Sequence, residues 1–183
     1  MPTQDAKVAK TNATYFDDNR EYAANVARLA TYRNIRRAIN GELVGMGRLL
    51  DVGNGGVFDY NTDLAREVVG VDLFLDADAA RSPAANVVLR RGDALALSED
   101  DAAYDGVLQA FVFHHLTGSR PDDVVPNIRR ALSEAHRVLV PGGRLIVAES
   151  CVPAWMYAFE RVLFRPLALV AGTRLMSHPP TIQ

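Results

Sequence analysis

The chain has a single cysteine, Cys151, among its 183 residues, which excludes a disulfide framework and a metal site built from cysteines. This scarcity fits a reducing, cytoplasmic setting, and we expect no metal site. An excess of charge of one sign is also missing, because 20 Lys and Arg against 22 Asp and Glu leave a net charge of −2. Nucleic-acid binders usually carry a basic face, so we expect no nucleic-acid partner.

Long hydrophobic runs are absent as well. The first residues are polar and contain no apolar signal segment. The most apolar late stretch, 154–176, is interrupted by Glu160, Arg161 and Pro166 within the roughly 20 residues that a membrane span requires. We therefore predict no membrane span, and 49% hydrophobic with 23% charged residues predicts one globular domain over 1–183.

Five short aliphatic runs predict a parallel sheet, because near-continuous hydrophobicity is typical of strands buried on both faces. Helical spacing of apolar residues predicts an amphipathic helix over 19–40, closed by Asn40 and Gly41, and a second over 122–139, stopped by "VPGG". The segment 73–88 is too rich in Asp, Ala and Pro for more than one or two helical turns. The aliphatic runs are 47–52, 67–72, 86–93, 104–111 and 143–150.

The stretch "LLDVGNGGVFDY", 49–60, places three glycines within four positions behind the first run. A glycine-rich turn that opens a helix offers unpaired amides and the positive end of a helix dipole to an anionic group, whereas a tight turn without a ligand is the alternative. The dinucleotide fingerprint would need glycine where Phe58 stands. Together with the absence of a Tyr-x-x-x-Lys pattern, this disfavours a nicotinamide-dependent oxidoreductase.

Another register fits better. Asp51-x-Gly53-x-Gly55 is followed, 17 residues after Gly55, by Asp72 at the end of the next run. This pattern resembles the class I S-adenosylmethionine-dependent methyltransferases, whose loop is D/E-x-G-x-G-x-G, with Val57 in place of the third glycine. "RGDALAL", "YDGVLQAFVFHHL" and "SEAHRVLVPGGRLIVAES" resemble further family segments in the family's order, over about 48–150. The resemblance implies a three-layer α/β sandwich with a mostly parallel, Rossmann-like sheet.

The resemblance also implies S-adenosylmethionine as cofactor. The loop amides suit its methionine end, Asp72 its ribose hydroxyls and Asp93 its adenine amino group. The alternatives are a strand-end cap for Asp72 and a turn aspartate for Asp93. Asp51 would steady the loop through backbone hydrogen bonds rather than touch the substrate, and Leu73 and Ala94 would line the adenine. Main-chain carbonyls at the end of the fourth run would hold the ammonium. The implied cofactor residues are Asp51, Gly53, Asn54, Gly55, Asp72, Leu73, Asp93, Ala94, Gln109 and Ala110.

His114 and His115 follow the fourth run and are the candidate catalytic residues, because a histidine near its ordinary pKa removes a proton from a nucleophile. A loop-holding role is the alternative, since methyl transfer depends chiefly on proximity and orientation. We divide the domain into a lid segment (1–45), a cofactor-binding core (46–150) and a substrate-side helix (151–183). Aromatic residues of the outer segments would cover the cofactor or line an acceptor pocket; they are Tyr15, Phe16, Tyr22, Trp155, Met156, Tyr157 and Phe159.

The predicted function is methyl transfer from S-adenosylmethionine to a small molecule, with the acceptor atom left open among oxygen, nitrogen and carbon. The alternative is a degenerate methyltransferase-like interaction domain without activity. Val57 and the lack of the family's C-terminal antiparallel hairpin favour that alternative. Without the hairpin the fifth strand has an exposed edge, which a truncated chain, an omitted tail or a homodimer would explain.

Overall fold

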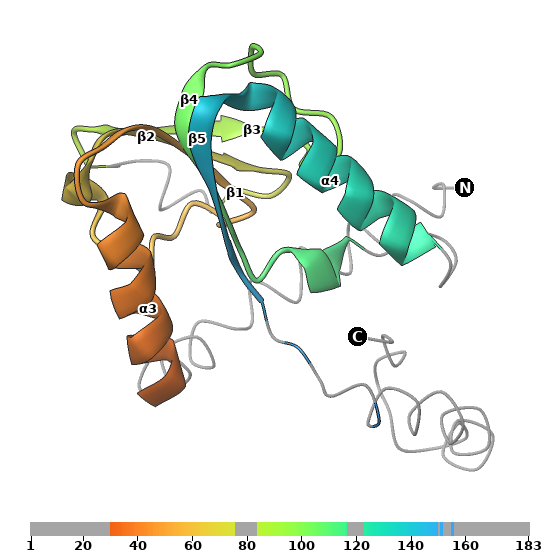
Figure 1. Ribbon diagram of the computed structural model, residues 1–183, viewed down its shortest axis with the longest axis horizontal. Helices are drawn as coiled ribbons and strands as arrows, with labels where there is room; N and C mark the ends of the chain where they lie inside the picture. The colour runs from red at the N-terminus through yellow and green to blue at the C-terminus, as the bar shows by residue number, and fades with distance from the viewer. Residues whose placement is uncertain (1–29, 76–83, 117–122, 150, 152–154, 156–183) are drawn as a thin grey trace.

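The computed structural model describes residues 30–75, 84–116, 123–149, 151 and 155. Within them, five strands form one parallel sheet in the order β3-β2-β1-β4-β5 (Figure 1). β1 lies at the centre and pairs with both β2 and β4. The strands are β1 Met46–Val52, β2 Ala65–Asp72, β3 Val87–Arg91, β4 Tyr104–Ala110 and β5 Leu139–Ala148.

Two helices cover the opposite faces of this sheet, α3 (Ala30–Leu43) and α4 (Val124–Val138), as Figure 1 shows. Alternate strand residues face each helix, so the core divides into two clusters. Leu43 of α3 packs with residues such as Leu49, and Val138 of α4 packs with residues such as Leu50. The predicted three-layer α/β sandwich with a parallel sheet is confirmed.

The helix α3 continues past the predicted stop at Asn40. Gly41 inside a helix costs about 1 kcal/mol relative to alanine, but Leu43 is completely buried in the core, and burying a leucine contributes about 1.5–3 kcal/mol. The helix ends before Gly45, whose φ of +73° favours glycine. The predicted part of this helix before residue 30 lies outside the described residues.

No α-helix follows the glycine loop, which corrects the prediction that the loop opens a helix. Residues 53–64 connect β1 to β2 and contain only the short 3₁₀ helix η1 (Thr62–Leu64). Asn61 fixes this connection, because its side chain caps η1 at Asp63 N and its own amide donates to the Asn40 side chain. A helix dipole therefore makes no contribution at the loop.

The strand β5 begins at Leu139, directly after α4, and residues 140–143, predicted as a turn, belong to it. A register shift opposite Tyr104 and Gly106 absorbs this irregular start. No helix in the described ranges is long and apolar enough to cross a bilayer. The predicted helical turns over 73–88 fall largely on residues 76–83, which lie outside the described residues.

Candidate functional site

The glycine loop leaves β1 at the carboxyl edge of the sheet, and Asp51, near the end of β1, anchors it through hydrogen bonds. Only 2% of Asp51 is exposed, and one carboxylate oxygen accepts hydrogen bonds from Asn54 Nδ2 and Tyr60 Oη, each 2.8 Å long. Burial raises the pKa of Asp51 to about 6, against the lowering effect of these two bonds. Asp51 thus holds the loop through two side-chain donors, whereas the resemblance implied hydrogen bonds to the backbone.

Two of the loop amides that we expected to be open, those of Gly53 and Gly55, are paired within the protein. Gly53 N donates to Val71 O at 2.7 Å, and Gly55 N donates to Asp72 Oδ2 at 2.7 Å. Gly56 N donates to Asn54 Oδ1 at 2.8 Å. Backbone N–H groups that leave water find partners almost without exception, which is the physical reason for this closure. A ligand carboxylate would have to exchange with these bonds.

Val57 does not disturb the loop. Its side chain is 59% exposed, and its φ is not among the positive ones. The loop residues with a positive φ are Gly53, Gly55 and Gly56. The third residue that needs to be glycine is therefore Gly56, directly before Val57. Gly56 thus supplies the backbone freedom that a third glycine at position 57 would have given.

Asp72 ends β2 and connects it to the glycine loop. Its Oδ1 accepts from Phe74 N at 2.7 Å, while its Oδ2 accepts from Gly55 N. Burial raises the pKa of Asp72, and the two backbone hydrogen bonds oppose that rise. Each carboxylate oxygen keeps a further lone pair, so the group can still accept two hydroxyls. Leu73 beside it is half exposed and offers apolar surface.

Asp93 forms a turn after β3. Its Oδ1 accepts from Leu95 N at 2.8 Å and its carbonyl accepts from Ala96 N at 3.0 Å, which is the turn-aspartate arrangement that we gave as the alternative. Ala94 packs against the core cluster under α4. Asp93 therefore stabilises the turn after β3 through these two hydrogen bonds.

Side chains of α4 form hydrogen bonds with the backbone of the loop that follows Asp93, and the sequence analysis did not predict this role. Arg137 donates to the carbonyls of Leu97 and Glu99 at 2.9 and 2.7 Å, and Glu134 accepts from Leu97 N at 2.9 Å. Glu134 and Arg137 also pair with each other at 2.9 Å. The acid–arginine spacing of three residues in "SEAHRVL" was the available signal, but nothing in it named the loop as partner.

Two unusual residues mark the exit from β4. Gln109 is 1% exposed, and both polar atoms of its side chain lack a hydrogen-bond partner in the described part of the protein. Phe111 has a φ of 58°, which is rare for a bulky residue, and its ring stacks on Tyr32 with centroids 5.2 Å apart. Ala110 between them is partly exposed. Strained backbone of this kind is concentrated at functional sites.

The β4 exit touches the glycine loop directly. A Cβ atom on Gly53 would lie 2.5 Å from Val112 Cγ2, so only glycine leaves room for this side chain. The contact follows from the pairing of β1 with β4, whose carboxyl ends meet at one edge. The loop after β1 and the turn after β4 thus form one surface.

The histidines lie in this turn, the 3₁₀ helix η3 (Phe113–His115). His114 Nδ1 lies 2.9 Å from Glu149 Oε1, and Phe113 N donates to Glu149 Oε2 at 2.8 Å. Burial and the neighbouring His114 lower the pKa of His115 to about 4, so His115 is neutral at physiological pH. Glu149 was not among the predicted site residues, although an acidic residue at the end of the fifth run was visible.

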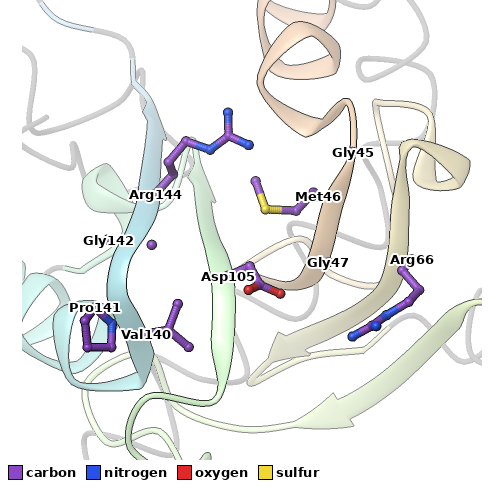
Figure 2. A pocket seen from close by; sticks show the side chains of 10 residues that line it. Gly45, Met46, Gly47, Arg66, Asp105, Val140, Pro141, Gly142 and Arg144 are labelled. Atoms are coloured by element: carbon purple, nitrogen blue, oxygen red, sulfur yellow. The ribbon is translucent and has the colours of Figure 1, made fainter.

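An open depression of about 570 Å³ lies at the opposite edge, where the strands begin. Figure 2 shows the side chains that line it. Arg66 and Arg144 flank Asp105, whose carboxylate accepts from Arg48 N at 2.7 Å. Of the residues that we predicted for a lid or acceptor pocket, Trp155 is 70% exposed. The others, Tyr15, Phe16, Tyr22, Met156, Tyr157 and Phe159, lie outside the described residues.

A comparison with known protein families agrees with the structure, which has this strand order, an anchored glycine loop and Asp72 at the end of β2. The sequence profile described as "Methyltransferase domain" matches residues 50–147, which is more than half of the chain. The chain belongs to the class I S-adenosylmethionine-dependent methyltransferases. The family resemblance found in the sequence is confirmed, and with it the family's cofactor.

Curated relatives of this methyltransferase chain are quinone-modifying enzymes by name. The chain is 33% identical over 166 residues to a demethylmenaquinone methyltransferase of Deinococcus radiodurans, covering 80% of this chain and 65% of that protein. It is 38% identical over 90 residues to the ubiquinone/menaquinone biosynthesis C-methyltransferase UbiE of Methylobacterium nodulans, covering 45% and 32%. This chain therefore spans less than two thirds of the length of either relative.

A solved structure supports the fold. The S-adenosylmethionine-bound CalS10, an amino pentose methyltransferase from Micromonospora echinaspora, superimposes with a TM-score of 0.52 at 23% identity, covering 73% of this methyltransferase chain and 57% of that one. The site also suits the family's cofactor, because Asp72 retains lone pairs for a diol and lies beside the exposed Leu73.

Proposed function

We propose that this chain forms the catalytic domain of an S-adenosylmethionine-dependent methyltransferase whose acceptor is a demethylated quinol, methylated at ring carbon. One observation carries the proposal: three features lie together at one edge of the sheet. They are the glycine loop anchored by Asp51, Asp72 at the end of β2, and the histidine turn held by Glu149. The acceptor class is supported by the relatives, of which one is named for demethylmenaquinone and one for C-methylation.

In this proposal Asp72 accepts hydrogen bonds from the ribose hydroxyls, and Asp93 with Ala94 and Leu73 borders the adenine. The loop from Gly53 to Gly55 and the carbonyls of Gln109 and Ala110 hold the methionine end. When bound, S-adenosylmethionine supplies an electrophilic methyl group on sulfur. The protein's contribution is to place the acceptor in line with that methyl and to exclude water.

The degenerate interaction domain is the second candidate, and the paired loop amides favour it. Gly53, Gly55 and Gly56 give their N–H groups to the protein itself, so a ligand gains only the difference between two sets of hydrogen bonds. Val57 does not support this candidate, because it is exposed and unstrained.

Calorimetric titration with S-adenosylhomocysteine and with NAD separates the candidates. Binding of S-adenosylhomocysteine alone supports the methyltransferase, whereas binding of neither supports the interaction domain. Asp72→Ala should weaken S-adenosylhomocysteine binding by about 1.5–3 kcal/mol, the range for hydrogen bonds to charged groups. Asp63→Ala on exposed η1 is the matched control and should bind as the wild type does.

Transfer of a labelled methyl group then tests the acceptor. We expect label in demethylmenaquinol and none in an analogue whose ring carbon already carries a methyl. If the wild type binds S-adenosylhomocysteine but labels only an amine or hydroxyl acceptor, the quinol assignment is wrong while the methyltransferase assignment stands.

A further inference from the structure

Glu149 uses both carboxylate oxygens to hold one turn. Oε2 accepts from Phe113 N at 2.8 Å, and Oε1 lies 2.9 Å from His114 Nδ1. The residue follows β5 directly and is 14% exposed at its side chain, so this carboxylate is fixed from two directions. Its position relative to His114 is therefore set by the sheet rather than by a flexible side chain.

The turn lies against the predicted cofactor loop. Val112, which immediately precedes η3, fills the space above Gly53. His114 is 29% exposed at its side chain, so a ligand can reach the ring. The histidine–carboxylate pair thus stands at the carboxyl edge of β4 and β5, next to the loop after β1.

The contact sets the tautomer of His114. An ionised carboxylate only accepts hydrogen bonds, so a neutral imidazole facing Glu149 carries its proton on Nδ1. Nε2 then has an unshared electron pair, and among the residues that the structure describes the ring's hydrogen bond is made through Nδ1. The ring of His115 lies against that of His114, with centroids 3.9 Å apart.

We propose that His114 is the general base of methyl transfer and that Glu149 is the positioning residue that keeps its Nε2 unprotonated. This inference rests on the proposed function and deepens it, since it selects one of the two histidines and adds a residue that the family resemblance did not bring forward.

With a quinol acceptor, His114 Nε2 takes the proton of the acceptor hydroxyl, which raises electron density on the adjacent ring carbon. A bond forms between that carbon and the methyl group, and the methyl–sulfur bond breaks with its electron pair left on sulfur. The ring carbon then loses its proton to water, which restores the aromatic ring and leaves the acceptor oxygen negatively charged. His114 returns its proton to that oxygen and so restores the hydroxyl.

Glu149→Gln tests the pair, because the amide oxygen can keep the bond from Phe113 N while the amide N–H₂ faces His114. A donor at that place requires an unprotonated Nδ1, so the variant should invert the tautomer and put the proton on Nε2. Nitrogen-15 NMR of the imidazole ring reads the tautomer directly in the full chain, bound to S-adenosylhomocysteine. We expect Nδ1–H in the wild type and Nε2–H in the variant.

The kinetic expectation is a loss of about 10²–10⁴-fold in kcat, the usual contribution of a general base, with the affinity for S-adenosylhomocysteine unchanged. His114→Gln should show the same loss. His136→Gln, on the exposed side of α4, and Glu42→Gln, on α3, are matched controls and should retain wild-type kcat.

Three results would overturn the proposal: an Nε2–H tautomer in the wild type, unchanged kcat in His114→Gln, or an inverted tautomer in Glu149→Gln with unchanged kcat. If the wild type labels no quinol, the proposed acceptor fails, and the NMR result still decides whether Glu149 fixes the tautomer. If Glu149→Gln does not fold, His114→Gln carries the kinetic test.

Discussion

Replacing Gly53 by alanine should destabilise the protein because two independent effects act at this one position. Its φ of +85° lies in the left-handed region, which costs an L-residue about 1–2 kcal/mol. The added Cβ would also lie 2.5 Å from Val112 Cγ2, and overpacking of this kind costs about 1–3 kcal/mol. We therefore expect Gly53→Ala to lower the free energy of unfolding by about 2–5 kcal/mol.

Gly45→Ala separates the two effects. Gly45 has a φ of +73°, but an added Cβ would meet no atom within 4 Å, so its substitution carries only the backbone cost of about 1–2 kcal/mol. Urea unfolding followed by circular dichroism measures both variants. The difference between them reports the contact between the glycine loop and the histidine turn.

Val112→Ala in the Gly53→Ala background completes a double-mutant cycle. The smaller side chain should recover part of the loss, so the two changes together should cost less than the sum of the single costs. If Gly53→Ala loses no more stability than Gly45→Ala, or if Val112→Ala adds its full cost, the loop and the turn are not in contact and the site is not assembled as described.

Further outcomes follow from the shifted pKa values of Asp51 and His115 and from the contacts of α4. Asp51→Asn should remove one pH dependence. The folded-state pKa of Asp51 is raised from 3.8 to about 6, so the stability that this carboxyl contributes is greatest below the lower value and falls by about 3 kcal/mol as pH rises through the upper one. Denaturant titrations of the variant over this pH range should lack that fall. His115→Asn should remove a pH dependence of the opposite sign. The pKa of His115 is lowered from 6.5 to about 4, so the stability that this residue contributes is lost as pH falls through that window. If thermal melts of the variant still show the whole loss of stability in acid, the lowered pKa of His115 is not its cause. Arg137→Met should accelerate amide hydrogen exchange over 95–101, since it removes the donors to Leu97 and Glu99, while exchange in β1 stays slow.

The sheet was predictable because every strand carries an aliphatic run. The runs of β1, β2 and β4 are largely buried, whereas the edge strands β3 and β5 are mostly exposed or half-buried. Five aliphatic runs identified five strands, and only the start of β5 was misplaced by several residues, because the Pro-Gly-Gly sequence suggested a turn. The end of α3 was misjudged for a related reason: the local preference of Gly41 lost to the burial of Leu43. Hydrophobic patterning predicted these helices and strands correctly, whereas single glycines were poor predictors of where they begin and end.

The site was only partly predictable, because its hydrogen bonds join residues that are far apart in the sequence. The position of Asp72 was read from spacing, but its bond to Gly55 N depends on how the loop closes over β2. The pairing of His114 with Glu149 spans 35 residues and needs β4 and β5 side by side. The positive φ of Phe111 leaves no mark on composition or periodicity.

That backbone geometry at Phe111 has a consequence for anyone who engineers this protein. A bulky residue held in the left-handed region stores about 1–3 kcal/mol, which the rest of the fold must supply. A more heat-resistant protein could be sought by relaxing this position, yet the same bend directs the chain from β4 toward the histidine turn. Resistance to heat and a competent site therefore compete at a single peptide unit.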